Sequence, residues 1–402
     1  MSENSLPKAS TMANRMANIA PFHVMEILAK AKQLSEQGRD IIRLEVGEPD
    51  FPTPDAIIRA GQQALAQGQT RYTPALGIPE LRAAISHFYQ QQLNVTVPPE
   101  RIAVTTGASG ALMLALAATT NPGDELLLPE PGYPCNRHFA ELLDVKPVAV
   151  NTFPDHRYRL TETLLTEHLS EKTKGLLIAS PANPTGALLS PTEESWIADF
   201  CRQYNLHWFM DEIYQGLTYD QAPNTVLARL AQEPKHNPHT WVIQSFSKYF
   251  QMTGWRLGWL VIPEGFENAV ERLAQNLYLS APTIAQYAAL SAFEPEVIQL
   301  LEQRKQELKL RRDYLVPALE GIGIKVQADA EGAFYIYCDV SKFTQDAMGF
   351  CHSLLESEGV SVTPGEDFGG EGKHTSIRIA YTEDIPRLQL AIEKIKHFIT
   401  KD

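Results

Sequence analysis

Short apolar runs alternate with segments of helical periodicity along the first two thirds of the chain. Seven of these runs are bounded by Gly, Pro or polar residues and are typical of short or buried strands: 41–46, 101–106, 125–128, 175–179, 206–214, 241–243 and 257–262. Apolar residues recur at helical spacing from 21 to 38 and from 191 to 204, which predicts helices there. The pattern therefore predicts strands that alternate with helices.

The pattern changes after residue 290. Residues 295–315 are charged and helical, and we expect them to connect the first part of the chain to a second one. Short strands are then predicted at 324–327, 332–337, 360–363 and 376–380, with helices at 344–358 and 387–399. This arrangement predicts a compact second α/β unit.

Composition narrows the class of protein. The 402 residues carry a net charge of -13 and contain no basic run, which argues against nucleic acid or a membrane surface as a partner. Four cysteines are scattered without the spacing of a metal site or redox pair, so we expect reduced thiols, no metal and a cytoplasmic location. Residues 1–13 are polar and are expected to form a flexible leader.

A lysine in the polar loop between two predicted strands is the first candidate for chemistry. Lys248 follows Ser245 and Ser247, and Arg256 comes eight positions later. Burial and a nearby cation would favour the free amine, which can form a Schiff base with an aldehyde, while serines and arginine suit a phosphate. The alternative is a solvated loop lysine.

Further candidates stand where predicted strands end. Gly107-Ala108-Ser109 joins a strand to a helix, as in a phosphate cradle or an ordinary turn. Asn183 lies between prolines and could present its amide or form an Asx-turn. Asp211 ends a strand and could face a ligand or cap a helix. Arg378 lies inside an apolar strand and needs an anion, either a substrate carboxylate or an internal one.

Taken together, these motifs resemble the fold-type I pyridoxal-phosphate aminotransferases of class I and II, the aspartate aminotransferase superfamily. The order Ser-x-Ser-Lys, Gly-Trp-Arg, Gly-Trp is kept, and the motifs span about 330 residues. The resemblance implies an α/β fold whose large domain has a mostly parallel seven-stranded sheet flanked by helices. It also implies a smaller α/β domain built from the N- and C-terminal segments. We expect an arm and part of the small domain at 1–45, the large cofactor-binding domain at 46–290 and the small C-terminal domain at 291–402.

The resemblance also implies a role for each matching residue. Lys248 would hold pyridoxal 5'-phosphate and move a proton, Asp211 would bind the ring nitrogen, and Tyr133 would stack on the ring. The other cofactor-binding residues implied are Gly107, Ala108, Ser109, Asn183, Tyr214, Ser245, Ser247 and Arg256, with Tyr72 and Ser280 from the neighbouring subunit of a homodimer. The substrate carboxylate would meet Gly47, Asn183 and Arg378. The active sites would then lie at the subunit interface.

The expected reaction moves an amino group between an L-amino acid and a 2-oxo acid. Some aspartate-preferring relatives place a lysine near Ser109 or an arginine near Tyr278, and this sequence has neither. That favours a neutral donor such as alanine or an aromatic amino acid, with glutamate and 2-oxoglutarate left open as the coupled pair. Arg15, Phe22 and His23 are candidates for the side-chain pocket. Three alternatives stay open: a decarboxylase, β-lyase or acyl-transferring synthase of the same fold; a regulatory module; and a nicotinamide-binding oxidoreductase.

Overall fold

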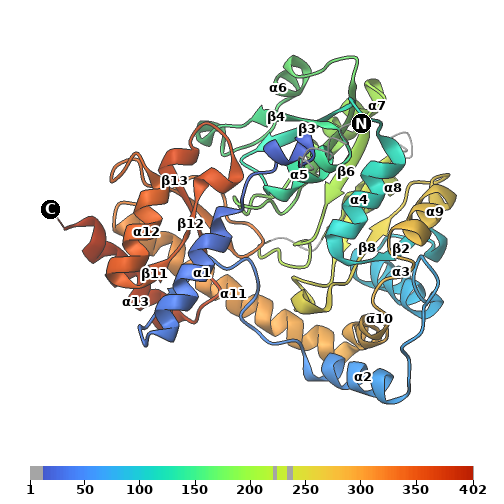
Figure 1. The fold of residues 1–402 in the computed structure, drawn as a ribbon, viewed down its shortest axis with the longest axis horizontal. Helices are drawn as coiled ribbons and strands as arrows, with labels where there is room; N and C mark the ends of the chain where they lie inside the picture. Colours follow the sequence, from blue (N-terminus) through green and yellow to red (C-terminus); the bar gives the residue numbers. More distant parts are fainter. Residues whose placement is uncertain (1–11, 221–223, 233–238, 402) are drawn as a thin grey trace, which may run out of the picture.

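A twisted sheet of seven strands forms the centre of the larger part of the molecule (Figure 1). The computed structural model describes residues 12–220, 224–232 and 239–401. The strand order is β2-β8-β7-β6-β5-β3-β4, and only β8 runs antiparallel to its neighbours. The strands are β2 (Ile102–Thr105), β3 (Glu125–Glu130), β4 (Lys146–Asn151), β5 (Thr173–Ala179), β6 (His207–Asp211), β7 (Thr240–Ser245) and β8 (Gly258–Val261).

Both faces of this sheet are apolar, because successive side chains of a strand point to opposite faces. On β6, for example, Trp208 and Met210 belong to one buried cluster and Phe209 to the other. One face is covered by α3 (Pro79–Leu93) and α7 (Pro191–Gln203). The opposite face is covered by α4 (Gly107–Thr119), α5 (Cys135–Leu142) and α9 (Glu267–Leu277). Because helices cover both faces, a ligand can reach the sheet at the carboxyl ends of its parallel strands.

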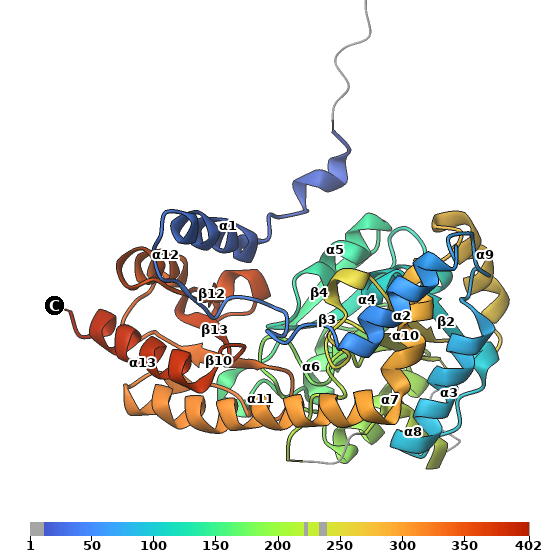
Figure 2. The ribbon, with the colours of Figure 1, turned by 90° about the horizontal axis from the view of Figure 1, so that it is seen from below.

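The smaller part combines the two ends of the chain. Helix α1 (His23–Glu36) lies among the C-terminal elements in Figures 1 and 2, and β1 (Ile42–Arg43) pairs in parallel with β11 (Val360–Ser361). Beside them is a four-stranded sheet of order β12-β13-β10-β9. Its strands are β9 (Lys325–Val326), β10 (Tyr335–Asp339), β12 (Thr363–Pro364) and β13 (Ser376–Ala380), with α12 (Ala347–Glu358) and α13 (Ile385–Ile399) packed nearby. The predicted fold class is confirmed.

Helix α11 (Pro295–Gly321) connects the two parts and runs along both of them in Figure 2. The remaining helices are α2 (Asp55–Ala66), α6 (Glu162–Glu167), α8 (Val226–Gln232) and α10 (Thr283–Leu290). Short 3-10 turns are η1 (Asn14–Ala17), η2 (Pro99–Arg101), η3 (Pro154–His156), η4 (Thr253–Trp255), η5 (Ser291–Phe293), η6 (Gly365–Phe368) and η7 (Lys373–Thr375). Among the helices of the described residues, none combines the length and apolar character needed to cross a membrane.

The predicted boundaries differ from the observed ones for local reasons. Helix α12 begins at 347 rather than 344, because the side chain of Asp346 accepts a hydrogen bond from the amide of Gly349 and caps the helix. Strand β10 begins at 335 rather than 332, since Ala333 has a φ of 57° and interrupts extended backbone. The expected strand at 41–46 pairs only over β1. Most of the expected leader, residues 1–11, lies outside the described residues.

Candidate active site

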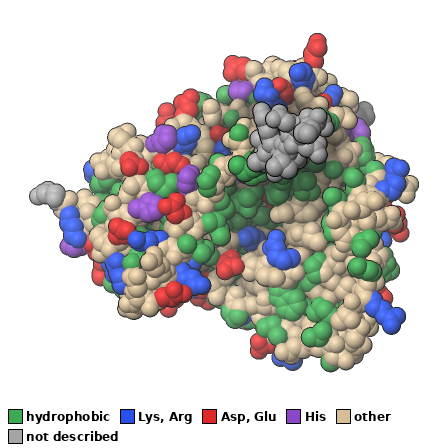
Figure 3. Space-filling model, viewed as in Figure 1, with side chains coloured by type: hydrophobic (Ala, Val, Ile, Leu, Met, Phe, Trp, Pro, Cys, Tyr) green, Lys and Arg blue, Asp and Glu red, His purple; other side chains and the backbone are tan. Residues whose placement is uncertain are grey.

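The predicted site residues come from both parts of the molecule. Asp211 is the last residue of β6 and Lys248 follows β7 in the large sheet, whereas Arg378 lies on β13 of the small one. Figure 3 shows a hollow near the middle of the viewed face, between the two parts, where hydrophobic side chains gather. The junction between the parts therefore brings together polar groups that are far apart in the sequence.

Lys248 lies in the loop between β7 and β8, with its amine turned inward. Its Nζ donates a hydrogen bond to the carbonyl oxygen of Gly47 over 2.5 Å. Burial, and then the positive charges of Arg378 and Arg256, lower the pKa of this amine from 10.5 to about 8. At pH 7 the neutral amine is then roughly 300 times more abundant than in an ordinary lysine. Lys248 is therefore not a solvated loop lysine.

Asp211 stands at the carboxyl end of β6, between β5 and β7, and its residue is only 4% exposed. Burial raises the pKa of its carboxyl group to about 6, although a hydrogen bond from the amide of Ile213 and the charge of Lys248 oppose that rise. Within the described residues no Lys, Arg or His pairs with it at ion-pair distance. A buried carboxylate in this state can hold a cationic group of a ligand.

The first turn of α4 and the loop before β8 form a candidate phosphate cradle. Helix α4 begins at Gly107 with no side-chain cap, so its first amide groups, including those of Ala108 and Ser109, are available to an anion. Arg256 covers this end: its guanidinium lies 3.0 Å from where a side chain on Gly107 would begin. Gly258 allows β8 to lie close to the first turn of α4, because a Cβ at this position would stand only 2.9 Å from the amide nitrogen of Ala108.

Ser245 ends β7 beside this cradle, and Ser247 lies two residues further along. The hydroxyl oxygen of Ser245 accepts a hydrogen bond from the amide of Ser247 at 3.0 Å, and both residues are buried. Because its oxygen is the acceptor in this bond, the hydroxyl proton of Ser245 can be donated to another group. The loop that carries Lys248 thus also supplies a hydroxyl near the end of α4.

Arg378 and Asn183 form a second polar group across the junction. Arg378 is 3% exposed and donates to the side-chain oxygen of Asn183 at 3.0 Å and to the carbonyl oxygen of Glu45 at 2.9 Å. Among the residues that the structure describes, its Nε has no hydrogen-bond partner. Across residues 12–220, 224–232 and 239–401 no carboxylate forms an ion pair with it. The internal ion pair that the sequence left open is therefore not observed, and the guanidinium can bind an anion.

Three aromatic residues that the sequence did not single out, Phe334, Tyr335 and Phe368, border these groups. The hydroxyls of Tyr214 and Tyr335 are 2.9 Å apart, and the Arg378 guanidinium lies 4.2 Å from the Tyr335 ring. Phe334 lies 5.9 Å from the Lys248 amine, and Phe368 lies 5.0 Å from Arg378. The aromatic run from Phe334 could have drawn attention to this strand. No feature of the neighbouring sequence indicated that β10 would lie close to the end of β6.

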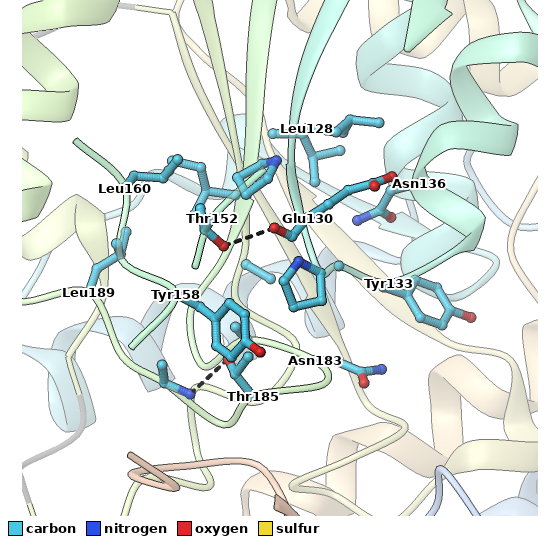
Figure 4. A pocket seen from close by; sticks show the side chains of 18 of the residues that line it. Leu128, Glu130, Tyr133, Asn136, Thr152, Tyr158, Leu160, Asn183, Thr185 and Leu189 are labelled. Atoms are coloured by element: carbon cyan, nitrogen blue, oxygen red, sulfur yellow. Dashed lines mark hydrogen bonds between the residues drawn. The ribbon is translucent and has the colours of Figure 1, made fainter. Parts of the chain in front are cut away.

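Tyr133 follows a loop with a cis peptide bond before Pro131, and Phe22 meets its ring edge-on at 6.3 Å. Figure 4 shows Tyr133 and Asn183 on the same side of a cavity that they help to line. The walls of that cavity come from the end of β3 and the segment after it, from residues 152–160, and from β5 and the loop after it. Tyr133 is thus placed beside the Arg378 partner Asn183.

Some predicted residues lie elsewhere in this single chain. Tyr72 is 81% exposed, and Ser280 is half-buried. Their two segments are neighbours, since the hydroxyl of Thr283 donates to the carbonyl oxygen of Arg71. Arg15 donates a hydrogen bond to the backbone carbonyl oxygen of Leu142, at the end of α5, and forms an ion pair with the carboxylate of Asp144. The backbone amide of His23 donates a hydrogen bond to the carboxylate of Asp367.

Comparison with known proteins gives one family. The family model for aminotransferases of class I and II matches residues 39–395. The valine–pyruvate aminotransferase of Mycobacterium tuberculosis is 37% identical over 379 residues, 94% of this chain and 96% of the relative. The (5-formylfuran-3-yl)methyl phosphate transaminase of Methanocaldococcus jannaschii is 36% identical over 390 residues, 97% and 100% of the two chains.

A solved structure agrees with these relatives. The crystal structure of an aminotransferase from Mycobacterium tuberculosis has a TM-score of 0.91 with this chain at 36% identity, covering 97% of this chain and 99% of the other. At such identity and coverage the likeness extends beyond the fold. The chain belongs to the class I and II aminotransferases of fold type I, a family that depends on pyridoxal phosphate, and it is an enzyme that transfers amino groups.

Proposed function

We propose that this aminotransferase binds pyridoxal 5'-phosphate between the two parts of the molecule and that Lys248 is the residue joined to it. The observation that carries the proposal is a partly buried amine of lowered pKa that shares one region with a buried carboxylate and an uncapped helix end. When bound, the cofactor supplies an aldehyde that joins an amine and a ring that withdraws electrons from it. The phosphate, the ring nitrogen, the phenolic oxygen and the aldehyde of the cofactor each have a proposed partner in this chain.

The phosphate would be held by the amides of Gly107, Ala108 and Ser109, by the Ser245 hydroxyl and by Arg256, with Ser247 fixing the orientation of Ser245. The amides and the positive end of α4 favour an anion, and the guanidinium adds charge. This set is supported by the missing side-chain cap of α4 and by the position of Arg256 over Gly107.

Asp211 would accept a hydrogen bond from the protonated ring nitrogen. Its carboxylate is buried and pairs with no cation in the described part of the chain, so such a partner would relieve the cost of burial. Asn183 and Tyr214 would donate to the phenolic oxygen, and Tyr133 would lie against the ring. The side-chain oxygen of Asn183 already accepts from Arg378, so its amide nitrogen is turned toward other partners.

Lys248 would act as the base and acid of the transfer. A pKa of about 8 keeps enough neutral amine near pH 7 to take a proton from the substrate α-carbon, and enough protonated amine to return it. The carbonyl oxygen of Gly47 accepts from Nζ in this structure and would hold the amine in place between these steps. Arg378 would grip the α-carboxylate by two parallel hydrogen bonds.

We propose a neutral amino donor and a 2-oxo acid acceptor. Position 109 bears a small hydroxyl at the open end of α4, and position 278 an uncharged phenol, so neither supplies a cation for a second carboxylate. The relative from Mycobacterium tuberculosis is named for valine and pyruvate, neither of which has a charged side chain, and this agrees with the choice.

We also propose a homodimer in which Tyr72 and Ser280 reach the site of the partner subunit. The support is the exposure of Tyr72 at 81% together with that of Leu277 at 54% and Leu279 at 52%, near the adjoining segments. Apolar groups exposed in this way are usual at interfaces. All four cysteines are free, which suits a cytoplasmic protein. Large and small domains would divide at residues 45/46 and 290/291.

The test is an absorbance spectrum of the purified protein before and after borohydride, followed by a screen of amino donors and 2-oxo acids. We expect an absorbance band in the visible range that borohydride removes, with the mass of the reduced cofactor found on the peptide of Lys248. Attachment to any other lysine would refute the assignment. Lys248→Ala should abolish transfer and leave the far-ultraviolet circular dichroism unchanged.

A further inference from the structure

The segment from η6 to Gly370 touches three separate regions around the site. The carboxylate of Asp367 accepts hydrogen bonds from the amides of His23 and Val24, each at 2.8 Å, and so holds the N-terminus of α1. The ring of Phe368 is fully buried and lies 5.0 Å from the Arg378 guanidinium. This segment therefore supports one side of Arg378 with an aromatic ring.

The same segment is fastened to the loop that precedes Tyr133. The carboxylate of Glu130 accepts a hydrogen bond from the amide of Gly370 at 2.9 Å, and the amide of Gly132 donates to the carbonyl oxygen of Phe368, also at 2.9 Å. Arg137 donates to the carbonyl oxygen of residue 367 at 2.7 Å and lies 3.4 Å from the Glu130 carboxylate. These contacts join residues about 240 positions apart.

The fit at this contact is close. A Cβ on Gly369 would stand 2.3 Å from the carboxylate of Glu130, and the backbone there has a φ of +75°. Gly370 has a φ of +82°. Only glycines allow the backbone to turn this way so near to the carboxylate. The contact thus depends on a specific acid and on specific glycines.

We propose that Glu130 is a positioning residue for the substrate carboxylate. By holding Gly370, it keeps the Phe368 ring against Arg378 and at the same time keeps the 130–132 loop, and hence Tyr133, at a set distance from that guanidinium. Arg378, proposed to bind the substrate carboxylate, and Tyr133, proposed to lie against the cofactor ring, are then both placed by one carboxylate whose own partners are Gly370 and Arg137. This inference rests on the proposed assignment of Arg378 to the substrate carboxylate.

The test compares Glu130→Ala and Glu130→Gln in the holoenzyme, using the best amino donor of the screen. Removing the carboxylate should raise KM about tenfold, the effect of one charge-assisted hydrogen bond, and change kcat by less than about threefold. The dissociation constant of pyridoxal 5'-phosphate should change less than KM, because Tyr133 is the one proposed cofactor-binding residue next to this loop and the proposed phosphate and ring-nitrogen ligands lie on other elements. Glu130→Gln keeps an acceptor for Gly370 and should recover most of the lost affinity.

Hydrogen exchange supplies a readout independent of activity. The amide of Gly370 should exchange faster in Glu130→Ala, and the peptide that contains Phe368 should follow. Asp220→Asn is the matched control: it removes contacts to Lys309 and Arg312 of α11, 3.2 and 2.8 Å long, and should alter neither KM nor this exchange. Gly369→Ala perturbs the same contact from the opposite side and serves if Glu130→Ala does not fold.

An unchanged KM in Glu130→Ala would overturn the inference. So would a parallel loss of donor and cofactor affinity, which a general loss of structure would produce. If Arg378→Lys also leaves KM unchanged, the fault lies in the carboxylate assignment; if only the Glu130 variants are silent, the assignment stands and the positioning role of Glu130 is wrong.

Discussion

Replacing Asp211 with asparagine should make the cofactor-free protein more stable at neutral pH. The carboxyl pKa is about 6 in the folded chain against 3.8 in the unfolded one, mainly because burial disfavours the charge. Between these values the folded protein binds more protons than the unfolded one. Stability therefore falls as pH rises from about 4 to about 6, and the loss is complete above pH 6.

The size of the effect follows from the shift. A difference of about 2.2 pH units corresponds to roughly 3 kcal/mol at neutral pH, where the buried charge is fully formed. Asparagine removes that charge, and its oxygen can still accept from the amide of Ile213. Its amide nitrogen has no partner in place of the carboxylate, which costs about 1 kcal/mol. The expected net gain is therefore about 2 kcal/mol.

Urea unfolding of the two apoproteins, at equal concentration and at pH 4.5 and pH 8, measures this difference. The variant should be more stable at pH 8, and the gain should shrink or vanish at pH 4.5. Asp155→Asn, at an exposed carboxylate, is the control and should change the free energy of unfolding by less than about 0.5 kcal/mol. A variant that is equally or less stable than the parent at pH 8 would refute the reasoning. With pyridoxal 5'-phosphate added the order should reverse, since asparagine has no negative charge to stabilise a protonated ring nitrogen.

Three further outcomes are expected. In the apoprotein, the rate at which an amine reagent labels Lys248 should rise with a midpoint near pH 8, measured by peptide mass spectrometry; a midpoint above pH 10 would contradict the lowered pKa. Gly258→Ala should weaken cofactor binding at least tenfold, because its Cβ would collide with the first turn of α4, and equal binding would show that this turn is not the phosphate site. Tyr72→Ala should raise the dissociation constant of the cofactor several-fold with little change in unfolding, because the ring is almost fully exposed in one chain; an unchanged constant in a dimeric protein would remove Tyr72 from the partner's site.

The location of the site follows from how the two parts meet. The large sheet offers Asp211 and Lys248 at the carboxyl ends of β6 and β7, and the small sheet offers Arg378 from β13. Each of these groups would be costly to bury alone. In the folded chain the Lys248 amine, the Asp211 carboxylate and the Arg378 guanidinium lie near one another. Within the described residues neither Asp211 nor Arg378 forms an ion pair, so both charged groups are available to ligands.

Local order in the chain was enough to predict most of the large sheet and the chemistry-bearing loops. Alternating and continuous apolar runs marked the strands, since burial on both faces demands them. Asp211 ends β6, and Asn183 and Lys248 lie in the loops that follow β5 and β7. Whether a residue stands at the end of a strand depends on its neighbours in the sequence, so it can be predicted without the tertiary structure.

The tertiary structure decided what those residues meet. The sequence could not show that Gly47 would accept from Lys248, that Tyr335 and Phe368 would lie against Arg378, or that Glu130 would hold Gly370. The contacts of Gly47 with Lys248 and of Glu130 with Gly370 join residues 201 and 240 positions apart. The two aromatic contacts of Arg378 depend on how the elements of the small part pack together. Packing also decides the pKa of Lys248, because burial and the approach of Arg378 exist only once the chain has folded.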